Sequence, residues 1–163
     1  MSGIIFDQLR DDHIDLYGDY YTRTGFRPCH PLMEYKELSN FQLSMDMIER
    51  FYKLKGGSTY IFGLKSRETG KLSWCLLEFS EFESAIFGFK VGRVSNIISE
   101  DMTEGNLYMF FREFLCQARK AGYTYLTMSV NHNDGGGACV INSSIKSGFR
   151  FIANLVTFGF KSE

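Results

Sequence analysis

Apolar positions recur with different periods along the chain, and each period predicts an element. Residues 4–6 form a short apolar run that is typical of a strand. Helices are expected between residues 11 and 25 and between residues 44 and 56, because apolar residues share one helical stripe between a capping residue and a glycine. The connection at residues 26–40 contains both prolines, which predicts an irregular segment and a candidate lid or binding loop.

The middle of the chain predicts a meander of three strands. Residues 59–64 and 71–79 are strand-like and flank a polar turn that contains a glycine. Residues 87–98 are interpreted as the third strand. Within it, Gly88 and Gly92 are expected to mark a bulge or a close approach of the backbone to a neighbouring group.

The clearest helix follows this meander. Apolar residues recur at helical intervals from Leu107 to Ala118. Ser99 or Thr103 is expected to begin the helix, and Gly122 is expected to end it.

The last third of the chain predicts a buried strand at residues 123–130, a short helix at residues 138–146 and a closing strand at residues 149–160. The strand–helix–strand passage between residues 91 and 130 implies a right-handed crossover and at least one parallel pair. We therefore expect one domain over residues 1–163, of the α/β class and more closely α+β, with a mixed, mostly antiparallel central sheet and helices on both faces.

Composition narrows the classes of function. With 44% hydrophobic and 16% aromatic residues, 163 residues can fill one core. Lys and Arg number 18 against 19 Asp and Glu, so we expect neither nucleic acid nor a membrane surface as a partner. The chain has no apolar run near the roughly 20 residues of a membrane helix and no signal-peptide pattern at its start, which predicts a cytoplasmic protein. Four widely spaced cysteines predict no metal site.

Two stretches carry a more specific signal. Residues 83–93 read ESAIFGFKVGR, and residues 121–131 are followed by the pair Gly148 and Phe149. Both resemble segments of the amino-sugar acetyltransferases related to dTDP-fucosamine-type enzymes, where they belong to an N-terminal GNAT-like half that precedes the coenzyme-binding half. The order of predicted elements over nearly the whole chain also resembles the GNAT superfamily of N-acetyltransferases.

The resemblance implies transfer of an acyl group from acetyl-CoA or another acyl-CoA to an amine of a sugar nucleotide or small metabolite. In that family the diphosphate of coenzyme A is held by backbone N–H groups of a Gln/Arg-x-x-Gly-x-Gly/Ala turn at a helix start. The corresponding turn here carries Glu100, Asp101 and Glu104, which favour the helix but repel a phosphate. The residues expected to border the coenzyme are Ile98, Thr103, Gly105, Asn106 and Asn131.

Three residues are candidates for acid–base catalysis. The family's proton donor to the departing thiolate is a tyrosine four residues before the Gly-Phe pair, and Ser144 stands there, although serine is a poor acid. Tyr123 is a substitute, but strand alternation places it with Tyr125 on one face, where packing explains both. Glu83, interpreted as lying near a strand end, is a candidate base for deprotonating the amine.

A glycine-rich segment lies between the predicted strand at residues 123–130 and the predicted helix at residues 138–146. Its residues Asn133, Gly135, Gly136 and Gly137 form a candidate ligand loop whose N–H groups could cradle an anion at the carboxyl end of a strand. The segment lacks the residues of a P-loop or a dinucleotide fold, so a surface loop without a ligand is the alternative.

Two functions stay open. The first is a GNAT-like acyltransferase domain, CoA-dependent and acting on an amine, with a degenerate coenzyme A site and a gap between strands 87–98 and 123–130 for the pantetheine arm. The alternative is a non-catalytic GNAT-like interaction or substrate-positioning domain, as the N-terminal half of a larger enzyme. A second GNAT domain or a second copy of the chain would then be its partner.

Overall fold

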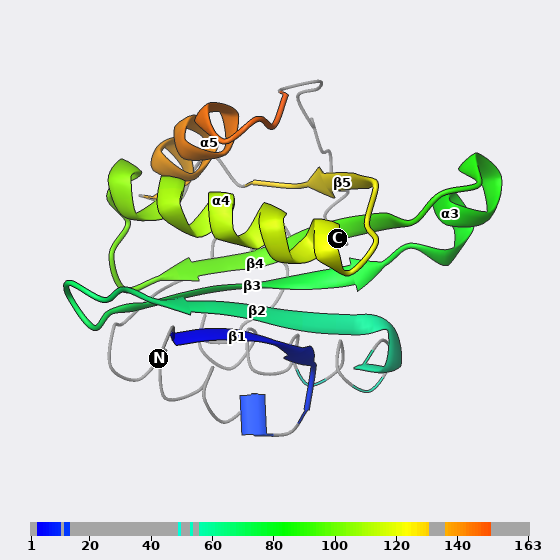
Figure 1. Cartoon of the computed structure of the whole chain (residues 1–163), viewed down its shortest axis with the longest axis horizontal. Helices are drawn as coiled ribbons and strands as arrows, with labels where there is room; N and C mark the ends of the chain where they lie inside the picture. Colours follow the sequence, from blue (N-terminus) through cyan, green and yellow to red (C-terminus); the bar gives the residue numbers. More distant parts are fainter. Residues whose placement is uncertain are drawn as a thin grey trace, which may run out of the picture.

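The structure is a computed structural model that describes residues 3–10, 12–13, 49, 53, 56–130 and 136–150. Its strands and helices are arranged in layers, with the longest helix lying across the sheet (Figure 1). The elements are β1 (Gly3–Gln8), the short helix η2 (Gly56–Ser58), β2 (Thr59–Lys65), β3 (Leu72–Phe79), α3 (Glu81–Phe87), β4 (Val91–Ser99), α4 (Glu104–Lys120), β5 (Tyr125–Met128) and α5 (Gly137–Lys146).

The described strands form one sheet in the order β1-β2-β3-β4-β5. The first three pairs are antiparallel, and β4 pairs with β5 in parallel. The parallel pair encloses α4 as its crossover, as the strand–helix–strand pattern predicted. The mixed, mostly antiparallel sheet is therefore confirmed.

Helix α4 supplies much of the core on one face of the sheet. Its apolar stripe at i, i+3, i+4 and i+7 is fully buried, and the ring of Phe62 lies 5.2 Å from that of Phe110 and 5.4 Å from that of Phe114. Thr103 caps the helix by accepting a hydrogen bond from the N–H of Asn106, so this predicted start is confirmed. Gly122, at φ 86°, follows the helix end, also as predicted.

The opposite face of the sheet also carries buried side chains. Ile61, Trp74, Leu76 and Ile98 alternate with the residues that face α4, and each is at most 4% exposed. Helix α5 packs against α4, on the same side of the sheet (Figure 1). The two helices expected before residue 57 lie outside the described residues, apart from helical residues at positions 12, 13, 49 and 53. Of the closing strand expected at residues 149–160, only residues 149 and 150 are described, and they are not in a strand.

The third strand begins at Val91, and its predicted start at residue 87 is wrong. Residues 81–87 instead form α3, which starts after an extended Ser80 and ends at Gly88 with φ 72°. The hydroxyl of Ser84 accepts a hydrogen bond from the N–H of Val91 at 2.9 Å, which ties the helix to the strand that follows. Gly88 therefore ends a helix and does not mark a bulge.

Gly92 is the close approach that the sequence predicted. A Cβ at this position would lie 2.7 Å from a methyl carbon of Leu77 and 2.9 Å from atoms of Leu126 and Tyr123. The backbone of β4 can pass these side chains only because residue 92 lacks a side chain. None of the described helices is long and apolar enough to cross a membrane.

Candidate functional site

Strands β4 and β5 separate halfway along β4. They pair from Val91 opposite Tyr125 to Val94 opposite Met128, whereas β4 continues to Ser99. Between Ser95 and Ile98, β4 has one more residue than the stretch of β3 it pairs with, which is a β-bulge. Because a bulge bends a strand and increases its twist, the second half of β4 diverges from β5.

The divergence leaves one edge of β4 open over residues 95–99, where no described strand pairs with it. Backbone N–H and C=O groups along such an edge can pair with an extended chain that carries amides. The gap expected between the third strand and the strand at residues 123–130 therefore has a structural basis. Its cause is the bulge, which lies three residues after the glycine that was expected to mark it.

The turn between β4 and α4, residues 99–106, is filled by its own polar side chains. The hydroxyl of Ser99 donates to the carbonyl of Asp101 at 2.8 Å and lies 2.6 Å from the hydroxyl of Ser73. The side-chain amide of Asn106 donates to Ser73 Oγ at 3.0 Å, to Ser99 Oγ at 3.2 Å and to the Asp101 carbonyl at 2.9 Å. Both serines are buried, so the network is closed to solvent on the sheet side.

The three acidic residues of this turn all accept hydrogen bonds, from β3, from the turn itself and from α5. Glu100 accepts a hydrogen bond from the N–H of Leu72 at 2.8 Å, and Asp101 accepts one from the N–H of Thr103 at 3.2 Å. These contacts brace the turn against β3 and begin the helix. They support the capping interpretation of the acidic residues.

Glu104 links the start of α4 to α5. One carboxylate oxygen forms an ion pair with Lys146, and the other accepts a hydrogen bond from the amide of Asn142 at 3.0 Å. The hydrogen bond from Lys146, followed by the one from Asn142, lowers the pKa of Glu104 below its ordinary value. Ser143 adds a hydrogen bond to the Glu104 carbonyl at 3.1 Å, so α5 is fixed against the turn.

The remaining residues expected at a coenzyme site occupy different surroundings. Gly105 lies in the first turn of α4 with nothing within 4 Å of an added Cβ, so space is open above it. Ile98 is 1% exposed and pairs with Trp74, which places it in the core. Asn131 lies outside the described residues. Of the residues expected at the coenzyme site, those in the first turn of α4 are therefore the ones that solvent can reach.

Glu83 lies far from the β4–α4 turn. Glu83 lies in α3 and pairs with Arg93 near the start of β4, at 3.2 Å. The six residues from there to Ser99 span roughly 20 Å of strand, and α3 and the β4–α4 turn lie at opposite ends of the sheet (Figure 1). Hydrogen bonds from Ser80 and then Arg93 lower the pKa of Glu83, which weakens it as a base.

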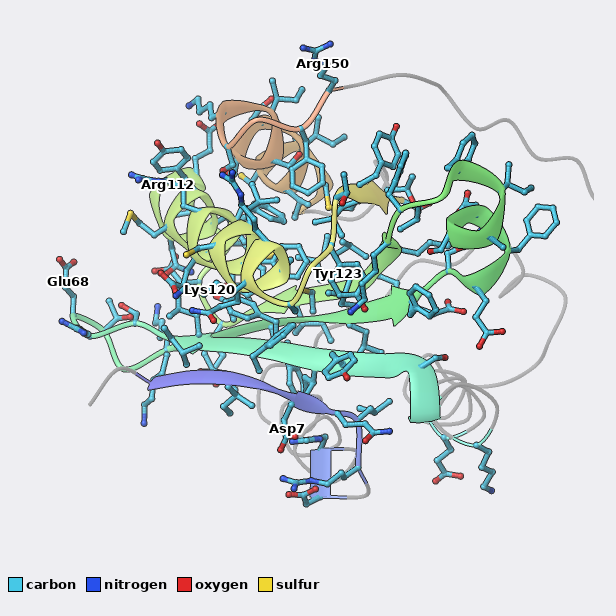
Figure 2. All side chains as sticks on the ribbon, turned by 45° about the vertical axis from the view of Figure 1, so that its right-hand side comes forward. Asp7, Glu68, Arg112, Lys120, Tyr123 and Arg150 are labelled. Carbon is cyan, nitrogen blue, oxygen red and sulfur yellow. The ribbon has the colours of Figure 1, made fainter. Side chains whose placement is uncertain are left out.

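Ser144 and Tyr123 are both nearly buried. The hydroxyl of Ser144 donates to the carbonyl of Ile141 in its own helix, at 2.8 Å. Tyr123 lies between the end of α4 and the sheet (Figure 2), and its hydroxyl has no hydrogen-bond partner among the described residues. Burial raises the pKa of this phenol to about 12. Tyr125, in contrast, is 49% exposed, so the expectation that both tyrosines share one packed face is wrong.

The two tyrosines differ because the strand alternation does not reach back to residue 123. The N–H groups of Thr124 and Tyr125 both donate to the carbonyl of Lys90, which turns the chain before β5 begins. The ammonium of Lys90 lies 4.2 Å from the ring centre of Tyr123 and donates to the Ala121 carbonyl at 2.9 Å. Tyr123 is thus part of the packing at the end of α4.

Tyr123 and Ser144 do border the same open cleft. It has a volume of about 1400 Å³, lies between α5, β5 and the end of α4, and includes Leu126, Ile141 and Phe149 in its lining. Glu83 does not line it. The catalytic roles of Glu83, Tyr123 and Ser144 stay predictions.

The candidate ligand loop is described only at its end. Asn133 and Gly135 lie outside the described residues, whereas Gly136 and Gly137 begin α5. A Cβ on Gly136 would meet the terminal methyl of Met102 in the β4–α4 turn, which is the flexible end of that side chain. The described residues contain no group of three or more side chains that could hold a metal ion.

Sequence reasoning missed the network of Ser73, Ser99 and Asn106. A signal for it exists, because Ser73 and Ser99 are polar residues at inward positions of otherwise apolar strands. Their pairing across two strands could not be read from the sequence.

Comparisons with known proteins identify the fold through solved structures. No protein-family model and no curated protein matches the sequence. Solved structures do match over nearly their full lengths. A probable acetyltransferase aligns with a TM-score of 0.60 and 16% identity over 98% of this chain and 99% of its own. A predicted acetyltransferase from Clostridium acetobutylicum, solved with acetyl-CoA, has a TM-score of 0.57 and 11% identity over 98% and 96%.

A ribosomal-protein-alanine N-acetyltransferase from Brucella melitensis aligns with a TM-score of 0.54 and 13% identity over 99% of each chain. Identities this low show a shared fold and nothing finer. The chain therefore has the fold of the GNAT acetyltransferases, as its element order predicted. The resemblance to the amino-sugar enzymes stays a prediction.

Proposed function

We propose that this chain is an acyltransferase-type GNAT domain, related to those acting on an amine of a sugar nucleotide or small metabolite, whose own coenzyme A site is degenerate. The observation that carries the proposal is the filled β4–α4 turn. The side-chain amide of Asn106 occupies the inside of this turn through its contacts with Ser73, Ser99 and the Asp101 carbonyl.

A diphosphate needs successive N–H groups that are free to point at it, at the positive end of a helix. Several of those groups are already used here. The N–H of Asp101 donates to Ser99, that of Thr103 to Asp101, and that of Asn106 to Thr103. An arriving diphosphate would also meet the carboxylate of Asp101 in this turn, and negative charges repel each other over ~8 Å at physiological salt.

The pantetheine arm of the coenzyme would depend on other groups than those that hold the diphosphate. Bound acyl-CoA would supply an activated thioester, and the open edge of β4 at residues 95–99 is suited to orienting an extended amide chain. Two of the candidate groups for proton transfer are poorly placed, because Glu83 lies roughly 20 Å from the turn along β4 and Ser144 donates to its own helix. The open edge of β4 and the N–H groups already used in the β4–α4 turn together support a degenerate coenzyme A site.

The alternative function, a non-catalytic interaction or substrate-positioning domain, is favoured by a different observation. Helix α3 exposes Phe82, Ile86 and Phe87 to solvent, which is unusual for a helix of a domain that acts alone. In this alternative the site for acyl-CoA lies on a second GNAT domain.

Thermal unfolding in the presence of acetyl-CoA tests the proposal. At 1 mM ligand, a dissociation constant of ~1 mM would add about 0.4 kcal/mol, whereas one of ~10 µM would add about 2.7 kcal/mol. For a domain of this size these gains correspond to shifts in Tm of about 1 °C and about 5–10 °C. We expect the smaller shift or none.

Acetyl-pantetheine, which lacks the diphosphate, is the matched control ligand. If the diphosphate seat is degenerate, acetyl-CoA and acetyl-pantetheine should give the same small shift. A shift of several degrees that only acetyl-CoA produces would contradict the proposal. So would release of free thiol from acetyl-CoA when a primary amine acceptor is added.

A further inference from the structure

We draw no further inference here: the strongest candidate, the open cleft between α5, β5 and the end of α4, extends to Arg150, the last described residue, and nothing in the structure shows what fills it.

Discussion

Replacing Asn106 by alanine should destabilise the chain strongly, because its amide holds three parts of the β4–α4 turn together. The amide donates to Ser73 Oγ, Ser99 Oγ and the Asp101 carbonyl at 2.9–3.2 Å. It has only two hydrogens, so the contacts amount to about two full hydrogen bonds. At ~1–1.5 kcal/mol each, the loss is about 2–3 kcal/mol of the free energy of unfolding.

That loss should lower Tm by about 4–12 °C for a domain of this length. Asn142→Ala is the matched control, because Asn142 is an exposed amide with one hydrogen bond, to Glu104, and should cost about 0.5 kcal/mol or less. Urea unfolding followed by circular dichroism measures both. If the two variants differ by less than ~0.5 kcal/mol, the turn is not held by this network, and the argument for a filled diphosphate seat loses its basis.

Three further predictions concern other parts of the chain. Gly92→Ala should cost about 1–3 kcal/mol in urea unfolding because the new Cβ would lie 2.7 Å from a neighbouring methyl carbon, whereas Gly105→Ala, with open space, should be neutral or stabilising by up to ~1 kcal/mol. Tyr123→Phe removes a buried hydroxyl without a partner among the described residues, so its Tm should be unchanged or higher, and a clear drop would reveal a missed partner. Glu104 has a pKa lowered from 4.5, so its contribution to stability is present above pH 4.5 and lost as the pH falls through the folded-state value; acid unfolding of Lys146→Gln should lack this part of the pH dependence.

The periodic elements could be predicted because their signals are local. Helix α4 has an apolar stripe, the capping hydroxyl of Thr103 and a terminal glycine within 20 residues of sequence. Strands β2 and β3 flank a polar turn that closes on Gly70 with φ 68°. Each of these features works through neighbours in the chain, so no knowledge of tertiary contacts was needed.

Helix α3 was missed because its apolar residues contact no core. Phe87 and Phe89 were interpreted as the start of the third strand, but polar contacts of Ser84 and the left-handed Gly88 form and end a helix there. The bulge of β4 was expected at a glycine but lies at residues 95–98, where pairing with β3 determines it.

The site was harder to predict than the fold because its contacts join residues that are far apart in the sequence. The acids at residues 100, 101 and 104 were recognised, but their partners come from β3, from the turn itself and from α5. Ser73 and Ser99 are 26 residues apart and meet only because β3 and β4 pair in that register. Sequence spacing cannot show whether a carboxylate is free to repel a ligand or is already engaged.

The backbone determines where β4 and β5 stop pairing, whereas side chains determine the contacts inside the β4–α4 turn. The end of the pairing between β4 and β5 is a property of the backbone, which has one extra residue in β4 where it pairs with β3. The interior of the β4–α4 turn depends on which side chains stand at a few positions, and hydrogen bonds join Ser99 and Asn106 to the Asp101 carbonyl there. A fold shared at 11–16% identity therefore shows the arrangement of helices and strands, while the ability to hold coenzyme A has to be measured on this chain itself.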